Sequence, residues 1–155
     1  MFCEVNKEYK LTLLEGYDHG IQMPACYLLA LVDYVGMVFI IDGFHKAEMS
    51  PETIINKVHS LRMSNIGYTS IEDKILADPS IFRRGAGEKK VVGNKLSTIL
   101  YDKGNGINTR RANNDIINGI TKVQGYITIH PQLVNPFTGQ QGSPLIFHSD
   151  HLTFI

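Results

Sequence analysis

The sequence predicts an α/β fold with one mixed sheet, in which an antiparallel meander of three strands precedes parallel strands and helices flank the sheet. Three short apolar runs lie close together near the N-terminus, a well-marked amphipathic helix follows them, and further apolar runs then alternate with helical segments. The chain has 155 residues, of which 43% are hydrophobic. This size and composition predict one domain, residues 1–155, with its own core.

The meander is predicted to have three strands, at residues 11–17, 26–32 and 37–41. Leu11 and Leu13 alternate with Thr12 in the first run, which is the pattern of a half-buried strand. The second run is almost wholly apolar, so we expect it to be buried on both faces. A tight turn at residues 33–36 joins the second and third strands as an antiparallel hairpin.

A helix is predicted to begin at Ser50, whose side chain can cap it. Pro51 suits the first turn of this helix, and Glu52 suits the positive end of its dipole. Asn65 and Gly67 are predicted to end it. Apolar residues at helical spacing give it one buried face: Ile54, Ile55, Val58 and Leu61. A fourth strand is expected at residues 74–77, stopped by the proline that follows.

The second half of the chain is predicted to contain a loop, two helices and short strands. The loop spans residues 81–95, a short helix 96–103, an edge strand 107–109 and another strand 126–129, and a short apolar run resumes at residues 145–147. Asn113 or Asn114 is predicted to cap a longer helix. Gly119 within it predicts close packing on the sheet, because glycine otherwise costs a helix about 1 kcal/mol. Its apolar face is formed by Ile116, Ile117, Ile120 and Val123.

The bulk composition is neutral, with 15 Lys and Arg against 15 Asp and Glu. The chain therefore lacks the strong positive charge that would itself indicate nucleic acid, although a local basic patch is enough to bind DNA. Cys3 and Cys26 are too few for a disulfide framework and indicate a reducing cytosol. We expect no signal peptide, and no membrane span, because Asp33 and Gly36 interrupt the longest apolar stretch.

Two aspartates each follow an apolar strand, Asp18 after the first and Asp78 after the fourth. If these strands are parallel neighbours, both carboxylates emerge at one edge of the sheet, where α/β folds place their ligands. Two close carboxylates repel each other, and a divalent cation such as Mg²⁺ removes that repulsion. The alternative is that each aspartate is a solvated turn residue or a helix cap. Glu72 and Asp73 compete with Asp78 for the same role.

Several short motifs occur in a fixed order from about Tyr9 to the end of the chain. Gly-Tyr-Asp-His-Gly at 16–20 resembles the Gly-x-Asp-x-Gly motif of ribonuclease H-like nucleases, and Ala-Asp-Pro-Ser at 77–80 resembles the second acidic motif of phage terminase large subunits. Residues 113–131 resemble a helix–strand segment of that family, and residues 135–145 a loop of its podovirus-like members. Together they resemble the C-terminal, ribonuclease H-like nuclease domain of a phage terminase large subunit.

This resemblance implies a metal-dependent endonuclease module that cleaves double-stranded, concatemeric viral DNA during packaging in the host cytoplasm. It implies that Asp18 and Asp78 are catalytic and bind Mg²⁺ or Mn²⁺, as part of a two-metal site in the complete domain, so that metal-activated water attacks the phosphodiester. The implied partners are the terminase ATPase domain, the small terminase subunit and the portal, with no membrane.

The resemblance also implies a third carboxylate. Asp150, followed by His151, matches the start of the corresponding motif, whereas residues 152–155 look like the start of the helix that precedes it. We therefore expect the third acid beyond Ile155, which would make the domain C-terminally incomplete, and keep Asp150 as the other candidate.

Two other functions remain open. A free-standing resolvase-type nuclease would have the same fold and would prefer branched DNA. A non-catalytic DNA-binding or assembly fragment of a terminase would bind DNA without metal-dependent cleavage. An ATP motor is not predicted, because residues 87–95 lack the adjacent Gly-Lys-Ser/Thr of a phosphate loop.

The predicted mobile loop at residues 81–95 contains the DNA-binding candidates: Arg83, Arg84, Lys89 and Lys90. Replacing all four with alanine should weaken binding to every DNA sequence alike, because phosphate contacts carry no sequence information. The slope of log affinity against log salt on duplex DNA should fall by about 0.9 for each phosphate that the variant no longer neutralises. Titrations at several salt concentrations measure this slope, and an unchanged slope would show that the loop is only solvated.

Overall fold

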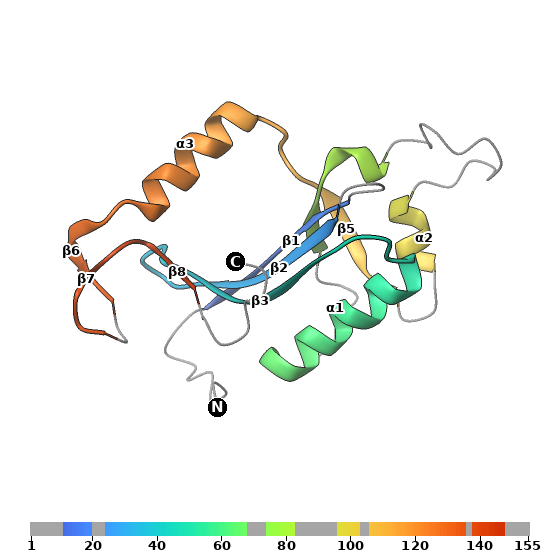
Figure 1. Ribbon diagram of the computed structural model, residues 1–155, viewed down its shortest axis with the longest axis horizontal. Helices are drawn as coiled ribbons and strands as arrows, with labels where there is room; N and C mark the ends of the chain where they lie inside the picture. The colour runs from blue at the N-terminus through green and yellow to red at the C-terminus, as the bar shows by residue number, and fades with distance from the viewer. Residues whose placement is uncertain are drawn as a thin grey trace.

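The computed structural model describes residues 11–19, 24–67, 74–82, 96–102, 106–135 and 138–147, and Figure 1 shows how its elements are arranged. In chain order these are β1 (Thr12–Asp18), β2 (Ala25–Val32), β3 (Val38–Lys46), α1 (Pro51–Ile66), β4 (Lys74–Ala77), the 3-10 helix η1 (Pro79–Phe82), α2 (Leu96–Asp102), β5 (Asn108–Arg111), α3 (Ile116–Ile127), β6 (His130–Val134), β7 (Gln141–Gly142) and β8 (Leu145–Phe147).

The main sheet has the strand order β5-β4-β1-β2-β3-β8. The pairs β1–β2 and β2–β3 are antiparallel, whereas β1–β4, β4–β5 and β3–β8 are parallel. The predicted α/β fold, a three-strand meander followed by parallel strands, is therefore confirmed. Strands β6 and β7 form a separate antiparallel pair.

Helices α1 and α2 pack on one face of the sheet, and Figure 1 shows α3 on its other side. The core between the sheet and helices α1 and α2 contains fully buried apolar side chains: Tyr27, Leu29, Ile54, Val58, Ile75, Leu100 and Ile107. Helix α1 begins and ends as its sequence predicts. The Ser50 hydroxyl accepts a hydrogen bond from the Thr53 amide at 3.2 Å, and Gly67 adopts the left-handed conformation with φ 74°.

A buried ion pair crosses this core. The Arg62 guanidinium on α1 donates two hydrogen bonds to the Glu15 carboxylate on β1, at 2.7 and 2.5 Å, and the Tyr27 hydroxyl on β2 donates a third. Glu15 is 4% exposed and Arg62 is 0% exposed. Burial and the Glu15 charge raise the pKa of Tyr27, so its hydroxyl stays protonated as a donor. The network connects the sheet to α1 through charged groups that are removed from solvent.

The meander differs from the prediction in two respects. Strand β2 is buried on the α1 face but only half-buried at Cys26 and Leu28 on the other face, so the expectation of burial on both faces was wrong. Strand β3 continues to Lys46 instead of ending at residue 41. Asp42 is buried within it because its carboxylate accepts hydrogen bonds from the Gly43 amide at 2.7 Å and the Asn65 side chain at 2.9 Å.

Helix α3 differs more. Its cap is Asp115, which accepts a hydrogen bond from the Asn118 amide at 3.1 Å, rather than either predicted asparagine. The helix continues to Ile127, so the strand predicted at residues 126–129 was wrong. The predicted packing of Gly119 on the sheet was also wrong, because nothing lies within 4 Å of an added methyl there. Much of its apolar face is exposed at Ile117, Ile120, Val123 and Ile127.

The first two residues of the predicted loop are helical instead. Ile81 and Phe82 belong to η1, and Ile81 is buried in the core. The remaining loop residues, 83–95, lie outside the described residues. Within the described part of the chain, no helix combines the length and apolar composition that crossing a bilayer requires.

The free energy of unfolding should depend on both members of the ion pair. Arg62→Met leaves the Glu15 carboxylate buried without its cation, so we expect the free energy of unfolding to fall by about 3–5 kcal/mol. The double variant Glu15→Met/Arg62→Met removes both charges and should be more stable than Arg62→Met alone. Urea unfolding followed by circular dichroism measures both changes.

Lys57→Met on the exposed side of α1 is the matched control, and it should cost no more than about 1 kcal/mol for its contact with the Phe44 ring. Strictly additive effects of Glu15→Met and Arg62→Met would contradict the coupling between the two charges.

Candidate active site

The two predicted aspartates lie at the ends of neighbouring parallel strands. Gly16 pairs with Leu76 and Tyr17 with Ala77 along β1 and β4. The Asp78 amide then donates a hydrogen bond to the Tyr17 carbonyl at 3.0 Å. Continued by one residue, this register sets Asp18 beside Asp78, as the predicted crossover requires.

Both aspartates line one pocket of about 280 Å³. The pocket is formed by β1, β2, β4 and the residue after β5, through Gly16, Tyr17, Asp18, Cys26, Leu28, Leu76, Asp78 and Ala112. Successive residues of a strand point to opposite faces of the sheet. Because the Glu15 side chain points toward α1, Gly16 and Asp18 face the opposite side of the sheet. The pocket therefore opens on the sheet face that α1 and α2 do not cover.

Asp78 is held in place by the turn that follows β4. One of its carboxylate oxygens accepts a hydrogen bond from the Ser80 amide at 2.7 Å, and its carbonyl accepts one from the Ile81 amide at 3.3 Å. The interpretation of Asp78 as a helix cap is thus correct, since it caps the first turn of η1. It is compatible with a ligand role, because a carboxylate has about four acceptor sites on its two oxygens.

At Gly16 no side chain covers the backbone at the base of the pocket. No atom lies within 4 Å of a methyl group added at this position, so neither packing nor backbone conformation requires glycine there. A glycine inside a strand weakens the strand and often marks a place where a ligand approaches the backbone closely.

The charge of Asp18 affects the titratable groups around it. Burial raises the pKa of the Cys26 thiol, and the Asp18 carboxylate raises it further. The same two causes raise the pKa of Tyr17. The Tyr17 hydroxyl lies 2.7 Å from His19 Nδ1, and burial lowers the pKa of His19 against the opposing effect of Asp18. Cys26 is therefore a protonated thiol at neutral pH and a poor nucleophile.

Asp18 and Asp78 supply the hard oxygen donors that Mg²⁺ and Mn²⁺ prefer. Within the described ranges, no group of three or more histidine, cysteine, aspartate or glutamate side chains is placed to share a metal ion. The chemistry of this pair fits one divalent cation whose remaining positions are filled by water or phosphate oxygens.

The other predicted site residues fall outside the described part of the chain. These are the DNA-binding candidates Arg83, Arg84, Lys89 and Lys90, the competing acids Glu72 and Asp73, and the third-acid candidate Asp150. Ala112 was not predicted as a site residue, and it lines the pocket because its amide donates a hydrogen bond to the Ala77 carbonyl at 2.8 Å.

Comparison with known proteins supports the fold. No protein family model and no curated protein matches the sequence. Among solved structures, that of the P22 large terminase nuclease domain is similar, with a TM-score of 0.50 and 14% sequence identity over 74% of this chain and 56% of that one. The chain thus spans little more than half the length of that domain. The similarity confirms the predicted ribonuclease H-like, terminase nuclease-like fold.

The electrostatics of the pocket can be tested at Cys26, in a Cys3→Ser background that leaves a single thiol. Asp18→Asn removes the negative charge that raises the thiol pKa, so the thiolate fraction and the alkylation rate at pH 7.5 should increase. Asp33→Asn, at the far end of β2, removes an equal charge and should leave the rate unchanged. Iodoacetamide kinetics provide the measurement, and equal rates for all three proteins would place Asp18 too far from Cys26.

Proposed function

We propose that the chain is the metal-dependent endonuclease module of a DNA-packaging terminase and that it hydrolyses phosphodiester bonds of double-stranded DNA. The observation that carries the proposal is the position of Asp18 and Asp78, at the ends of adjacent parallel strands in one pocket. The fold that this chain shares with the P22 large terminase nuclease domain supports the same assignment.

Asp18 and Asp78 would together hold the cation, which would stabilise the charge that develops on the phosphate and lower the pKa of a bound water. The Ser80 amide fixes the Asp78 carboxylate before substrate arrives, so little reorganisation is needed. Gly16 leaves room for the DNA backbone above β1. Leu28 and Leu76 give the pocket apolar walls, which lower the local dielectric and strengthen each charge interaction.

Water is the nucleophile in this proposal rather than a side chain. Cys26 is the thiol in the pocket, and its raised pKa leaves little thiolate at neutral pH. The substrate is concatemeric viral DNA in the host cytoplasm. The partners are the terminase ATPase domain, the small terminase subunit and the portal.

The proposal predicts metal-dependent nicking that requires both carboxylates. Asp18→Asn and Asp78→Asn should each reduce plasmid nicking in Mn²⁺ by on the order of 100-fold or more, because each removes charge stabilisation of several kcal/mol. Asparagine at position 78 can still accept the Ser80 amide, so the fold should be retained. Both variants should also weaken Mn²⁺ binding in calorimetry, which gives a readout independent of cleavage.

Asp115→Asn is the matched control, because it neutralises an exposed carboxylate outside the pocket while asparagine caps a helix as well as aspartate. An additional variant, Asp150→Asn, decides whether Asp150 is the third acid. Nicking that survives Asp78→Asn would contradict the proposal. DNA binding without Mn²⁺-dependent cleavage, both by this chain and by a form extended beyond Ile155 to include the expected third acid, would identify a non-catalytic module instead.

A further inference from the structure

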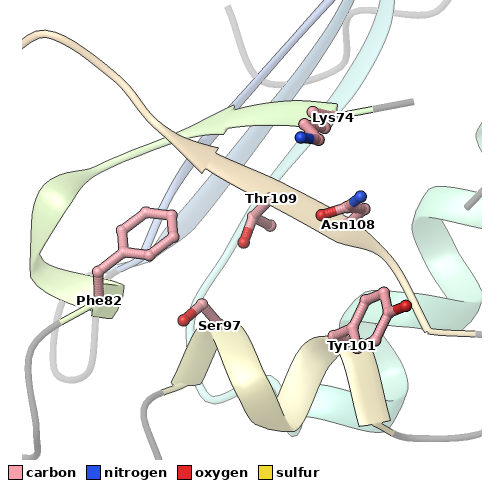
Figure 2. Close-up of a pocket in the computed structure, with 6 residues that line it drawn as sticks. All are labelled: Lys74, Phe82, Ser97, Tyr101, Asn108 and Thr109. Carbon is pink, nitrogen blue, oxygen red and sulfur yellow. The ribbon is translucent and has the colours of Figure 1, made fainter. Parts of the chain in front are cut away.

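A second pocket, of about 380 Å³, lies at the β5 edge of the sheet. Its lining comes from the start of β4, the end of η1, helix α2 and β5, through Lys74, Phe82, Ser97, Tyr101, Asn108 and Thr109. Figure 2 shows Phe82 at one end, Tyr101, Asn108 and Lys74 toward the other, and Ser97 and Thr109 between them. Its volume is in the range typical of small-ligand sites.

The lining combines three kinds of chemistry. Two aromatic rings offer flat apolar surfaces, Lys74 offers a positive charge, and the amide and hydroxyl groups offer hydrogen bonds to a polar edge. None of the described residues that line the pocket is acidic. A ligand that matches all three properties has a planar aromatic ring with polar edges and an attached anion, which describes a nucleotide.

Tyr101 is the most suitable stacking surface. Its side chain is 54% exposed, although it lies on a helix whose neighbouring residue, Leu100, is fully buried. The backbone beneath it is firmly placed. The Ile107 amide donates a hydrogen bond to the Leu100 carbonyl at 2.9 Å, and a methyl group added at Gly106 would collide with the Tyr101 carbonyl. The ring is therefore presented from the end of a helix that is hydrogen-bonded to the residue preceding β5, and such pre-positioning lowers the entropic cost of stacking.

A positively charged side chain lies at each end of the pocket. Lys74 pairs with Asn108 at the Tyr101 end. At the other end, the Arg111 guanidinium lies over the Phe82 ring, 6.0 Å from its centroid. Along β5, Asn108 and Arg111 are separated by about 10 Å of strand. If a base stacks in the pocket, each of its two flanking phosphates would lie near a positively charged side chain.

We propose that this pocket binds one unpaired nucleotide of a DNA strand, with its base on Tyr101 and its flanking phosphates near Lys74 and Arg111. The assignment of DNA as ligand rests on the proposed nuclease function. Lys74 lies at the start of β4 and Asp78 directly after its end, about 13 Å apart along the strand, a distance that a few nucleotides can span. A strand released at the aspartate pocket would thus reach the β5 edge within a few nucleotides.

The test is binding of a fluorescent single-stranded oligonucleotide and of its blunt duplex to the full 155-residue chain in EDTA, where cleavage cannot occur. Tyr101→Leu should weaken single-strand binding by about 5- to 100-fold, the decrease expected when one base–aromatic stack is removed. Duplex binding should change less than about twofold. Tyr101→Phe keeps the ring and should bind as the parent chain does. Lys74→Gln should reduce the salt slope on single strands by about 0.7.

Tyr34→Leu is the matched control, because Tyr34 is a tyrosine 74% exposed in the β2–β3 turn, outside the pocket. Unfolding midpoints identify any variant that fails through misfolding, and if Tyr101→Leu misfolds, the single-strand salt slope of Lys74→Gln tests the pocket in its place, where an unchanged slope would overturn the proposal. Because binding is measured in EDTA, its outcome does not depend on cleavage, so failure of the nuclease proposal in the nicking assay would not imitate failure here. Single-strand affinity unaffected by Tyr101→Leu, or an equal decrease in affinity for both DNAs, would overturn the proposal.

Discussion

The buried ion pair between Glu15 and Arg62 holds the central strand of the sheet in the register on which the aspartate pocket depends. Because Glu15 is fixed toward α1, strand alternation turns Gly16 and Asp18 toward the open face. A slip of one residue would bury Asp18 and expose Glu15. Tyr27 extends the constraint to β2 by donating its hydroxyl to the same carboxylate. Buried charges are costly, and this pair specifies orientation rather than contributing much net stability.

The crossover through α1 then brings distant parts of the chain together. It places β4 beside β1 in parallel, so Asp78 arrives next to Asp18 although sixty residues separate them in the sequence. Strand β5 adds the outer edge, and the residue that follows it completes the pocket. Since β4 contains Lys74 at its start and leads to Asp78 at its end, one short strand connects both proposed DNA contacts.

The sequence predicted the meander, helix α1 and the adjacency of the aspartates because each depends on local periodicity, on caps or on the handedness of crossovers. Glu15 and Arg62 were missed, although Glu15 alternates with Leu13 and Tyr17, and Arg62 follows Val58 by four residues. Glu15 and Arg62 therefore each lie on the apolar face of their element, and their charges are opposite. The exposure of α3 and the pocket at Tyr101 could not be predicted, because both depend on how helices are placed against the sheet.

The proposed function requires the Asp18 and Asp78 carboxylates to share a divalent cation. Anomalous diffraction from crystals soaked in Mn²⁺ tests it most directly, since Mn²⁺ scatters anomalously and water does not. We expect one strong peak bound by an oxygen of each carboxylate, at the roughly 2.1–2.2 Å typical of hard cations of this size. Mn²⁺ bound by only one of the two carboxylates, or bound elsewhere with this pocket empty, would rule out a shared cation.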